Sequence, residues 1–550
     1  MKLYVRLLLG CLSGLLLFLA WVPSYFPFLI FFAFIPLFFI SENIEKEQLR
    51  FPFLQGMHYS FPALLVWNVL TTWWIWNSTP QGSVATFILN ALLMSFIFGF
   101  WQWFRRLNRS SEILSPLFFI TAWISFEFLH LHWDLSWPWL NLGNVFASTT
   151  QYVQWYEFTG VFGGTLWVLI ANFLFYYWIQ SFKKDKKRKT VFTVTTLCWL
   201  IIPITISLIQ YYTYKHKHKD PIDVIIVQQN TDPWVEQYHM ANLHHAERIT
   251  EVVYPYLTPK TQLIVTSESS IPHTLLLDSL IQRNYPANFD LYNPYAGFVL
   301  FDTLLSYYPN LNIIAGLSTG TIHDTKISPV AQQRPDGRYW IFYNSSVCYN
   351  REGVVGVYHK SKLVPGVELM PFPKIFGFLE NFILRFGGAN CSLGKDTLQR
   401  VFSMPLLNGS CNIGVPICYE SVYGELFSHF VVNGASLMAV ITNDAWWDDT
   451  PGHRQHFLYA KLRAIETRRT ILRSANTGFS GIINERGDVL QKTAYNERTA
   501  IHALVYPNDK LTFYTLNGDY IARIALFTLP LLLLFSIFVK IKTKIKRVKK

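Results

Sequence analysis

The sequence predicts a membrane bundle of about eight transmembrane helices joined to a separate α/β domain. Of its 550 residues, 51% are hydrophobic and only 15% are charged, whereas soluble chains carry about a quarter charged residues. Apolar residues fill 3–211 and 521–539, and a mixed segment lies between them. This distribution predicts a membrane domain over 1–219, an extramembrane domain over 220–515, and a last span with a basic tail over 516–550.

The predicted spans follow from length and hydropathy. A bilayer core requires about 20 apolar residues in a helix, and eight stretches approach that length. They are 3–22, 25–40, 54–76, 84–104, 115–130, 160–180, 190–211 and 521–539. The second is short, and the third contains Gln55, His58 and Asn68, so its boundaries are the least defined.

Positive charge alternates between the predicted connections. Lysines and arginines occur at 2–6, 46–50, 105–109, 183–189 and 540–550, and none occurs in 22–24, 77–83 or 131–159. Because positively charged loops remain in the cytoplasm, both termini are expected there and the large domain on the opposite side. The net charge of +12 is therefore interpreted as a topology and lipid signal, and no nucleic-acid partner is expected.

The large domain alternates short apolar runs with helix-like stretches, which favours an α/β domain with a layered sheet. The predicted strands are Val224–Val227, Leu263–Val265, Ile313–Ala315, Trp340–Tyr343, Val354–Tyr358, Ile413–Ile417 and Leu437–Ile441. A helix is predicted from about Arg454 to Arg469, because Phe457, Leu458, Leu462 and Ile465 fall on one face.

Cys418 lies in the sharpest chemical motif. It ends the apolar run Ile413–Ile417, and a helix-like stretch, Ser421–Val432, begins just after it. At such a strand-to-helix turn, the positive end of the helix dipole is expected to lower the pKa of the thiol and favour the nucleophilic thiolate. The alternative is a buried structural cysteine.

Glu268 and Lys360 also follow predicted strands. Glu268 comes after Leu263–Val265, at the strand end where α/β active sites lie, and could act as a general base for a thiol. Lys360 follows Val354–Tyr358 and could stabilise an oxyanion. Taken alone, each is more often a solvated charge at the end of a strand.

In this order and setting, the three residues resemble the Glu-Lys-Cys triad of the carbon–nitrogen hydrolase (nitrilase) superfamily. Longer segments are similar to its apolipoprotein N-acyltransferase family, and the resemblance covers nearly the whole chain. They are Tyr343-Asn344-Ser345, Tyr358–Pro371, Ile417–Glu420, Thr442–Trp447, Gln455-His456, Arg473–Gly478 and, in the membrane part, Glu127 with Trp137–Gly143.

The resemblance implies an αββα sandwich for the α/β domain and a role for individual residues. Cys418 would be the nucleophile, Glu268 the general base and Lys360 the oxyanion stabiliser. The supporting residues would be Glu368, Tyr419 and Glu420. Lower-ranked candidates for lipid or substrate contact are Trp234, Trp446, Trp447, Trp137 and Trp139.

Two departures from the family pattern affect the loops around these residues. Thr266-Ser267 stands where the family usually has Trp-Pro before the catalytic glutamate, and Pro365-Gly366-Val367-Glu368 stands where it usually has Pro-Phe-Gly-Glu. They put the local loop packing in question, and they leave the spacing of the glutamate unchanged.

The implied activity transfers an acyl chain from a membrane phospholipid, through a cysteine thioester, to the N-terminal α-amine of the diacylglyceryl-cysteine of an apolipoprotein. The implied location is the bacterial inner membrane, with the catalytic domain in the periplasm. No organic cofactor is implied, and the absence of any Cys-x-x-Cys spacing argues against zinc. Two alternatives remain: a membrane-tethered amidase or nitrilase, and a non-catalytic transporter or scaffold.

The sequence leaves two further features open. Glu127, near the outer end of a span, could be functional or simply hydrated. Cys391 and Cys411 could form a disulfide in an oxidising compartment or remain free thiols.

Overall fold

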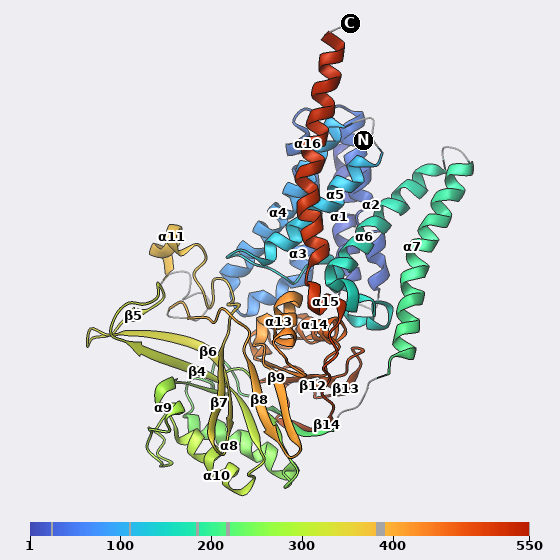
Figure 1. Ribbon diagram of the computed structural model, residues 1–550. Helices are drawn as coiled ribbons and strands as arrows, with labels where there is room; N and C mark the ends of the chain where they lie inside the picture. Colours follow the sequence, from blue (N-terminus) through green and yellow to red (C-terminus); the bar gives the residue numbers. More distant parts are fainter. Residues whose placement is uncertain are drawn as a thin grey trace. The chain divides into compact units, whose positions relative to one another are not determined.

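The computed structural model describes residues 1–21, 23, 26–108, 112–182, 186–215, 220–380 and 391–548. Parts of the basic segments used for the orientation, at 109, 183–185 and 549–550, lie outside these ranges. The chain divides into two compact units. Figure 1 shows the chain coloured by residue number. Unit 1 comprises Met1–Trp76, Gln81–Tyr212 and Asp519–Lys550, and unit 2 comprises Asn77–Pro80 and Thr213–Gly518.

Unit 1 is helical. Its long helices are α1 (Leu3–Ala20), α2 (Ile35–Lys46), α3 (Pro52–Thr72), α4 (Pro80–Leu107), α5 (Leu114–Leu131), α6 (Tyr156–Ser181), α7 (Lys186–Thr213) and α16 (Tyr520–Val548). Short 3-10 turns are η1 (Pro27–Phe31), η2 (Trp73–Asn77), η3 (Leu142–Ser148) and η4 (Thr150–Tyr152). Within the described ranges, seven segments are long and apolar enough to cross a membrane, with η1 and α2 counted together. This agrees with the expected number of about eight.

Helix α3 is the predicted span that is not among these seven. It carries Gln55, His58, Asn68 and an internal proline, Pro62. The amide of Asn68 is partly satisfied within the helix, because it donates to the carbonyl of Leu64 at 2.8 Å. Helix α3 also packs closely on α1.

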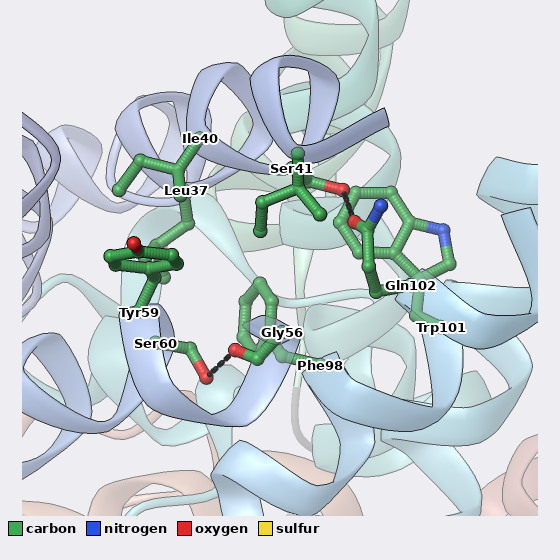
Figure 2. A pocket seen from close by; sticks show the side chains of 10 residues that line it. Leu37, Ile40, Ser41, Gly56, Tyr59, Ser60, Phe98, Trp101 and Gln102 are labelled. Carbon is green, nitrogen blue, oxygen red and sulfur yellow. Dashed lines mark hydrogen bonds between the residues drawn. The ribbon is translucent and has the colours of Figure 1, made fainter. Parts of the chain in front are cut away.

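Helices α2, α3 and α4 enclose a cavity of about 10 Å³ (Figure 2). Ser60 donates to the carbonyl of Gly56, and Ser41 donates to the side-chain oxygen of Gln102. A volume of this size accommodates about one water molecule, so the cavity is too small for a lipid chain.

Unit 2 has two sheets between two layers of helices, the αββα arrangement implied by the family resemblance. In the described residues, the first sheet has the order β14-β1-β2-β4-β6-β5, with β3 beside β4 and β7 beside β6, and the second has the order β13-β12-β11-β10-β9-β8. The strands of the first sheet are β1 (Ile222–Gln228), β2 (Leu263–Val265), β3 (Ile271–Leu276), β4 (Asn312–His323), β5 (Gln332–Gln333), β6 (Tyr339–Asn350), β7 (Gly353–His359) and β14 (Thr499–Val505). Those of the second are β8 (Val401–Leu406), β9 (Gly409–Gly414), β10 (Leu437–Thr442), β11 (Ile471–Ala475), β12 (Gly481–Ile483) and β13 (Val489–Lys492).

Five helices of unit 2 cover the outer faces of the two sheets (Figure 1). On the first sheet they are α8 (Asn242–Val253), α9 (Leu277–Ile281) and α10 (Ala296–Tyr307), and on the second they are α13 (Gly424–Val432) and α14 (Pro451–Thr467). The remaining described elements of unit 2 are the short helices α11 (Pro373–Phe376) and α15 (Phe513–Asn517) and the turns η5 (Tyr254–Tyr256), η6 (Gly377–Leu379), η7 (Cys418–Val422) and η8 (Asp444–Trp447). The helix predicted over 454–469 is confirmed as α14.

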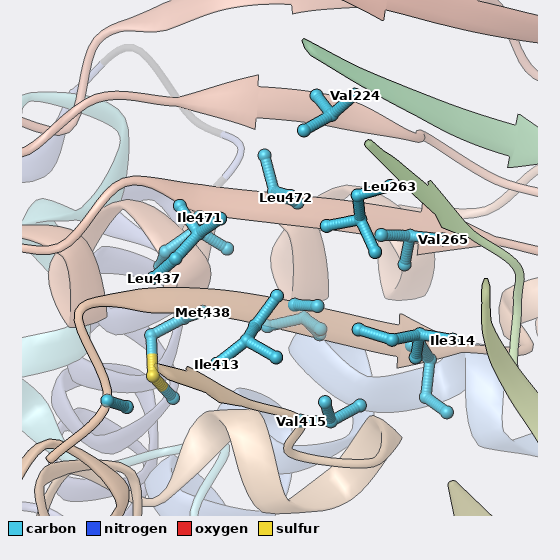
Figure 3. Packing of buried hydrophobic residues seen from close by; sticks show 14 of the residues in the cluster. Val224, Leu263, Val265, Ile314, Ile413, Val415, Leu437, Met438, Ile471 and Leu472 are labelled. Atoms are coloured by element: carbon cyan, nitrogen blue, oxygen red, sulfur yellow. The ribbon is translucent and has the colours of Figure 1, made fainter. Parts of the chain in front are cut away.

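Alternate side chains of β1 enter two different hydrophobic cores. Val224 and Ile226 belong to the core between the sheets, and Ile225 and Val227 belong to the core beneath α8 and α10. Successive strand residues point to opposite faces, so one short apolar strand serves both cores. Figure 3 shows Val224 with residues of both sheets in the inner core.

The segment around Cys418 differs from the prediction. Strand β9 ends at Gly414, three residues earlier than expected, and Ile417 keeps only an isolated parallel bridge to Ile441. The predicted helix over 421–432 is two pieces, the short turn η7 and then α13. Pro416 cannot donate a ladder hydrogen bond, which explains the early end of the strand.

Candidate active site

Strand ends bring the three predicted triad residues into one region. Glu268 follows β2 and Lys360 follows β7, both in the first sheet, whereas Cys418 opens η7 after β9 of the second sheet. Because each lies beyond the carboxyl end of its strand, residues up to 150 positions apart meet at one edge of the sandwich. The geometry makes Glu268 and Lys360 an ion pair adjoining the thiol.

Lys360 is buried between two carboxylates. Its Nζ lies 3.2 Å from Oε1 of Glu268 and 2.9 Å from Oε1 of Glu368, and the side chain is 1% exposed. Burial alone would lower the pKa of Lys360, but the two glutamates raise it well above its usual value. The lysine is therefore a fixed cation, which suits the stabilisation of a developing oxyanion.

Asn344 on β6 joins the two carboxylates, and the sequence indicated it only as part of the Tyr343-Asn344-Ser345 segment, without a role of its own. Its amide nitrogen donates to Oε1 of Glu268 at 2.7 Å and to Oε1 of Glu368 at 3.1 Å. Its backbone carbonyl accepts from the amide of Lys360 at 2.8 Å. The other oxygen of Glu268 accepts from the backbone of Asn443 at 2.9 Å, so Glu268 is held from both sheets.

The two departures from the family pattern leave both glutamates in this cluster. Before Glu268, the Thr266 hydroxyl lies 2.7 Å from that of Ser270, and the Thr266 amide donates to Ile314. Before Glu368, Gly366 takes a left-handed φ of +74°, which costs glycine little. The resulting turn lets Glu368 accept from the amide of Val364 at 2.8 Å.

Glu420 joins the segment that contains Cys418 to the loop that contains Lys360. One oxygen accepts from the Tyr358 hydroxyl at 2.6 Å and from the amides of Ser361 and Lys362 at 2.7 and 3.1 Å. The other accepts from the amide of Ile417 at 2.8 Å. Burial raises the pKa of Glu420, and these donors offset part of that rise. The carboxylate thus joins the segments that carry Lys360 and Cys418.

The expected depression of the thiol pKa is wrong. Burial and then the charge of Glu268 raise the pKa of Cys418, and the cation of Lys360 only partly offsets them. The helix dipole argument failed because η7 has only five residues, too few for a substantial macrodipole. A raised pKa favours the neutral thiol, and a thiol in that form requires a base to remove its proton before it can act as a nucleophile.

The tryptophan candidates of unit 2 lie on two segments, the loop around Trp234 and the turn η8. The rings of Trp234 and Trp446 meet edge to face at 4.9 Å, and Trp234 is 55% exposed. Trp447 lies 5.6 Å from the ring of His456, and Tyr419 packs against Tyr423 at 5.2 Å. These loops present exposed and half-buried aromatic surface.

The loop that carries Trp234 is anchored close to the cluster of Glu268, Lys360 and Glu368. Asn443, the residue that donates its amide to Glu268, also donates its side chain to Gln237 at 2.9 Å. Burial, followed by the charges of Glu268 and Glu368, raises the pKa of Tyr238 to about 12. The segment 231–241, which contains Trp234, therefore lies next to the carboxylates of Glu268 and Glu368.

In unit 1, Glu127 is buried and hydrogen-bonded. It is 3% exposed and accepts from the Trp123 ring, the Leu142 amide and the Thr165 hydroxyl at 2.9, 2.8 and 2.8 Å. Hydration at the interface is therefore the wrong alternative for this carboxyl group. It holds the end of the Trp137–Gly143 segment, in which Trp139 is buried and lies 6.1 Å from Trp137.

Cys391 and Cys411 are both free thiols in the structure. Cys411 is buried, with its sulfur 3.4 Å from the hydroxyl of Ser436. In the described part of the chain, no group of three or more His, Cys, Asp or Glu side chains forms a candidate metal site.

A layered α/β domain of this topology, with a Glu-Lys-Cys cluster at its strand ends and membrane-type helices in the same chain, defines a membrane-associated carbon–nitrogen hydrolase. The family model for carbon-nitrogen hydrolases matches residues 226–508. The model for the apolipoprotein N-acyltransferase N-terminal domain matches residues 13–174. The chain belongs to the apolipoprotein N-acyltransferase family within the carbon–nitrogen hydrolase superfamily.

Relatives of known name match along most of the chain. An apolipoprotein N-acyltransferase of Chlorobaculum tepidum is 26% identical, over 94% of this chain and 94% of its own length. One of Aquifex aeolicus is 27% identical, over 90% and 97%. Among solved structures, Nit3 of Saccharomyces cerevisiae, a nitrilase-superfamily member, is 16% identical with a TM-score of 0.35, over 54% of this chain and 93% of its own.

Proposed function

We propose that this protein transfers an acyl chain from a membrane phospholipid, by way of a thioester on Cys418, to the α-amine of a diacylglyceryl-cysteine at the N-terminus of an apolipoprotein. The observation that carries the proposal is the buried Lys360 cation held between Glu268 and Glu368 beside the thiol. The names of the relatives favour this acceptor over the small carbon–nitrogen substrates of an amidase.

In the first half-reaction, Glu268 removes the proton of Cys418 and the thiolate attacks the ester carbonyl carbon of the phospholipid. The carbonyl π electrons move onto oxygen, and Lys360 stabilises the oxyanion. When the oxyanion collapses, the carbon–oxygen ester bond breaks, and the leaving alkoxide takes the proton from Glu268. The products are the acyl-Cys418 thioester and a lysophospholipid.

In the second half-reaction, the α-amine attacks the thioester carbonyl carbon and passes a proton to Glu268. Collapse of the tetrahedral intermediate forms the amide and breaks the carbon–sulfur bond. The departing sulfur recovers its proton from Glu268. A covalent intermediate lets two bulky substrates use one site in turn. Glu368 and Glu420 position Lys360 and Cys418, and Tyr419, Trp234, Trp446 and Trp447 supply apolar contact near the thiol.

We further propose that residues 220–515 form a periplasmic catalytic domain, and that 1–219 and 516–550 anchor it in the inner membrane with cytoplasmic termini. The alternation of basic and neutral connections supports this orientation. Trp137 and Trp139 would then lie at the outer interface, where tryptophan is enriched.

The direct test is intact-mass analysis of the purified protein after incubation with phospholipid. We expect an added acyl mass on the peptide that contains Cys418, lost on addition of a diacylglyceryl-cysteinyl peptide. No adduct from phospholipid, together with ammonia release from a small amide, would favour the amidase alternative and contradict the proposal.

A further inference from the structure

His456 on α14 lies directly behind the nucleophile segment, and the chemistry described above does not use it. Its Nε2 atom lies 3.2 Å from the carbonyl oxygen of Cys418 and 2.9 Å from the hydroxyl oxygen of Ser421. The Ser421 hydroxyl donates to the same carbonyl oxygen at 2.7 Å. Two side-chain atoms, Nε2 of His456 and Oγ of Ser421, therefore converge on the carbonyl oxygen of Cys418.

The backbone conformation of Cys418 must be held by neighbouring groups. Cys418 has a φ of +51°, in the left-handed region that residues with a Cβ seldom occupy unless their surroundings hold them there. The direction of the thiol depends on this backbone conformation, because rotation of the peptide would swing the Cβ away from Lys360. Groups that fix the Cys418 carbonyl therefore also fix the aim of its side chain.

The far side of the His456 ring is equally constrained. Its Nδ1 atom lies 2.9 Å from Oδ1 of Asp444, whose other oxygen accepts from Arg473 at 2.7 Å. His456, Asp444 and Arg473 are 1%, 0% and 0% exposed. Although burial acts to raise it, Arg473 and His456 hold the pKa of Asp444 below its usual range. The ring thus links a fixed buried ion pair on β11 and η8 to the carbonyl of the nucleophile.

We propose that His456 is a positioning residue for the nucleophile: with Ser421, it holds the Cys418 peptide in the left-handed conformation that points the thiol at Glu268 and Lys360. The proposal deepens the acyl-transfer function and rests on it for its biological meaning. The reactivity of the Cys418 thiol, however, can be measured without any acyl substrate.

His453 provides a matched control on the same helix. It is also a buried histidine beside an aspartate, with Nε2 3.1 Å from Oδ1 of Asp449. Its ring packs against Phe479 and Tyr495 at 4.8 and 4.7 Å. Replacing either histidine with phenylalanine removes a buried imidazole from α14, but only His456 faces the Cys418 carbonyl.

The experiment measures the rate at which iodoacetamide alkylates Cys418 in the full-length protein in detergent, followed by peptide mass mapping. We expect His456→Phe to slow alkylation about tenfold or more, since a misplacement of about 1 Å can cost on the order of a hundredfold in rate. His456→Gln, which can still donate to the carbonyl, should recover part of the rate. Ser421→Ala should slow it less than His456→Phe, and His453→Phe should leave it unchanged.

An unchanged alkylation rate in His456→Phe, accompanied by a lower melting temperature, would reduce His456 to a packing residue and overturn the proposal. If His456→Phe does not fold, unchanged rates in both His456→Gln and Ser421→Ala overturn it instead. Thioester formation from phospholipid is followed in parallel in the wild-type protein. Its absence there, with the alkylation rates ordered as expected, would remove the acyl-transfer function and leave the positioning role standing.

Discussion

The ammonium nitrogen of Lys360 lies 2.9 Å from a carboxylate oxygen of Glu368, eight residues further along the chain. Lys362 is only two residues from Lys360, yet its ammonium lies 5.0 Å from the centre of the Tyr423 ring. The two lysines, which alternation alone could have directed to the same side, therefore have different environments. Only Lys360 belongs to the buried cluster with Glu268.

This difference predicts opposite outcomes for two matched substitutions. Lys360→Met should lower the rate of thioester formation by about a hundredfold to a thousandfold, the usual cost of losing one oxyanion donor. Lys360→Arg should also fail, because a planar guanidinium does not replace a compact ammonium. Lys362→Met should keep most activity. Loss of thioester formation in Lys362→Met, with Lys360→Met active, would refute the assignment of Glu368 as well.

Replacement of the nucleophile should abolish acyl transfer without unfolding the protein. Cys418→Ala is expected to lower the rate at least about a thousandfold, as in enzymes that lose a nucleophile. Cys418→Ser should fail too, because a hydroxyl is a far weaker acid than a thiol. Single-turnover assays and a detergent melting curve test both statements. Normal turnover by purified Cys418→Ala would exclude a Cys418 thioester.

Glu420 should act mainly through the two loops that it joins. Glu420→Gln places an amide group among backbone donors from Ser361, Lys362 and Ile417, so at least one buried N–H loses its acceptor. We expect a loss of about 2 kcal/mol or more in the free energy of unfolding, together with slower thioester formation. Glu251→Gln is the control, because Glu251 is largely exposed and lies 4.0 Å from Arg498. Equal stability of the two variants would contradict this role.

Acid should weaken unit 2 through His245. Burial lowers the pKa of this histidine to about 4, below the value of about 6.5 expected in the unfolded chain. The unfolded state therefore binds the proton more readily, and stability is lost as the pH falls from about 6.5 towards 4, by up to roughly 3 kcal/mol. Melting curves of His245→Gln should depend less on pH in this window, whereas those of the exposed His244→Gln should follow the wild type.

The orientation of the chain gives a prediction that does not depend on catalysis. Reporter fusions at Asp220 and after the end of α16 should report opposite sides of the membrane, because one candidate span lies between them. Activity of the periplasmic reporter at both positions would show that α16 does not cross. A fusion after Leu107 should behave like the C-terminal one, since both follow basic helix ends.

The sequence predicted most of the fold because its signals are local. The β2, β7 and β10 runs are short, apolar and bounded by polar residues, so the strand ends at Glu268 and Lys360 could be identified before any contact was known. The hydrogen-bond partners of Glu268 and Lys360 could not be identified in this way. Asn443 donates to Glu268 across 175 positions, and nothing in the spacing of Asn344 indicates that its amide bridges two glutamates. The thiol pKa was misjudged for the same reason, because burial is a property of the assembled domain.

The proposed general base, Glu268, and the proposed nucleophile, Cys418, follow strands of different sheets. Glu268 extends from the sheet that contains β2, and Cys418 extends from the sheet that contains β9. Much of what separates the two sheets is packed hydrocarbon, including Val265 and Ile413. The thickness of this apolar layer therefore influences the distance between the Glu268 carboxylate and the Cys418 thiol. A small change in core packing would alter that distance and slow the proposed proton transfer, while both sheets kept their hydrogen bonds. Substitutions that loosen this core should consequently lower the turnover rate before they measurably lower the free energy of unfolding.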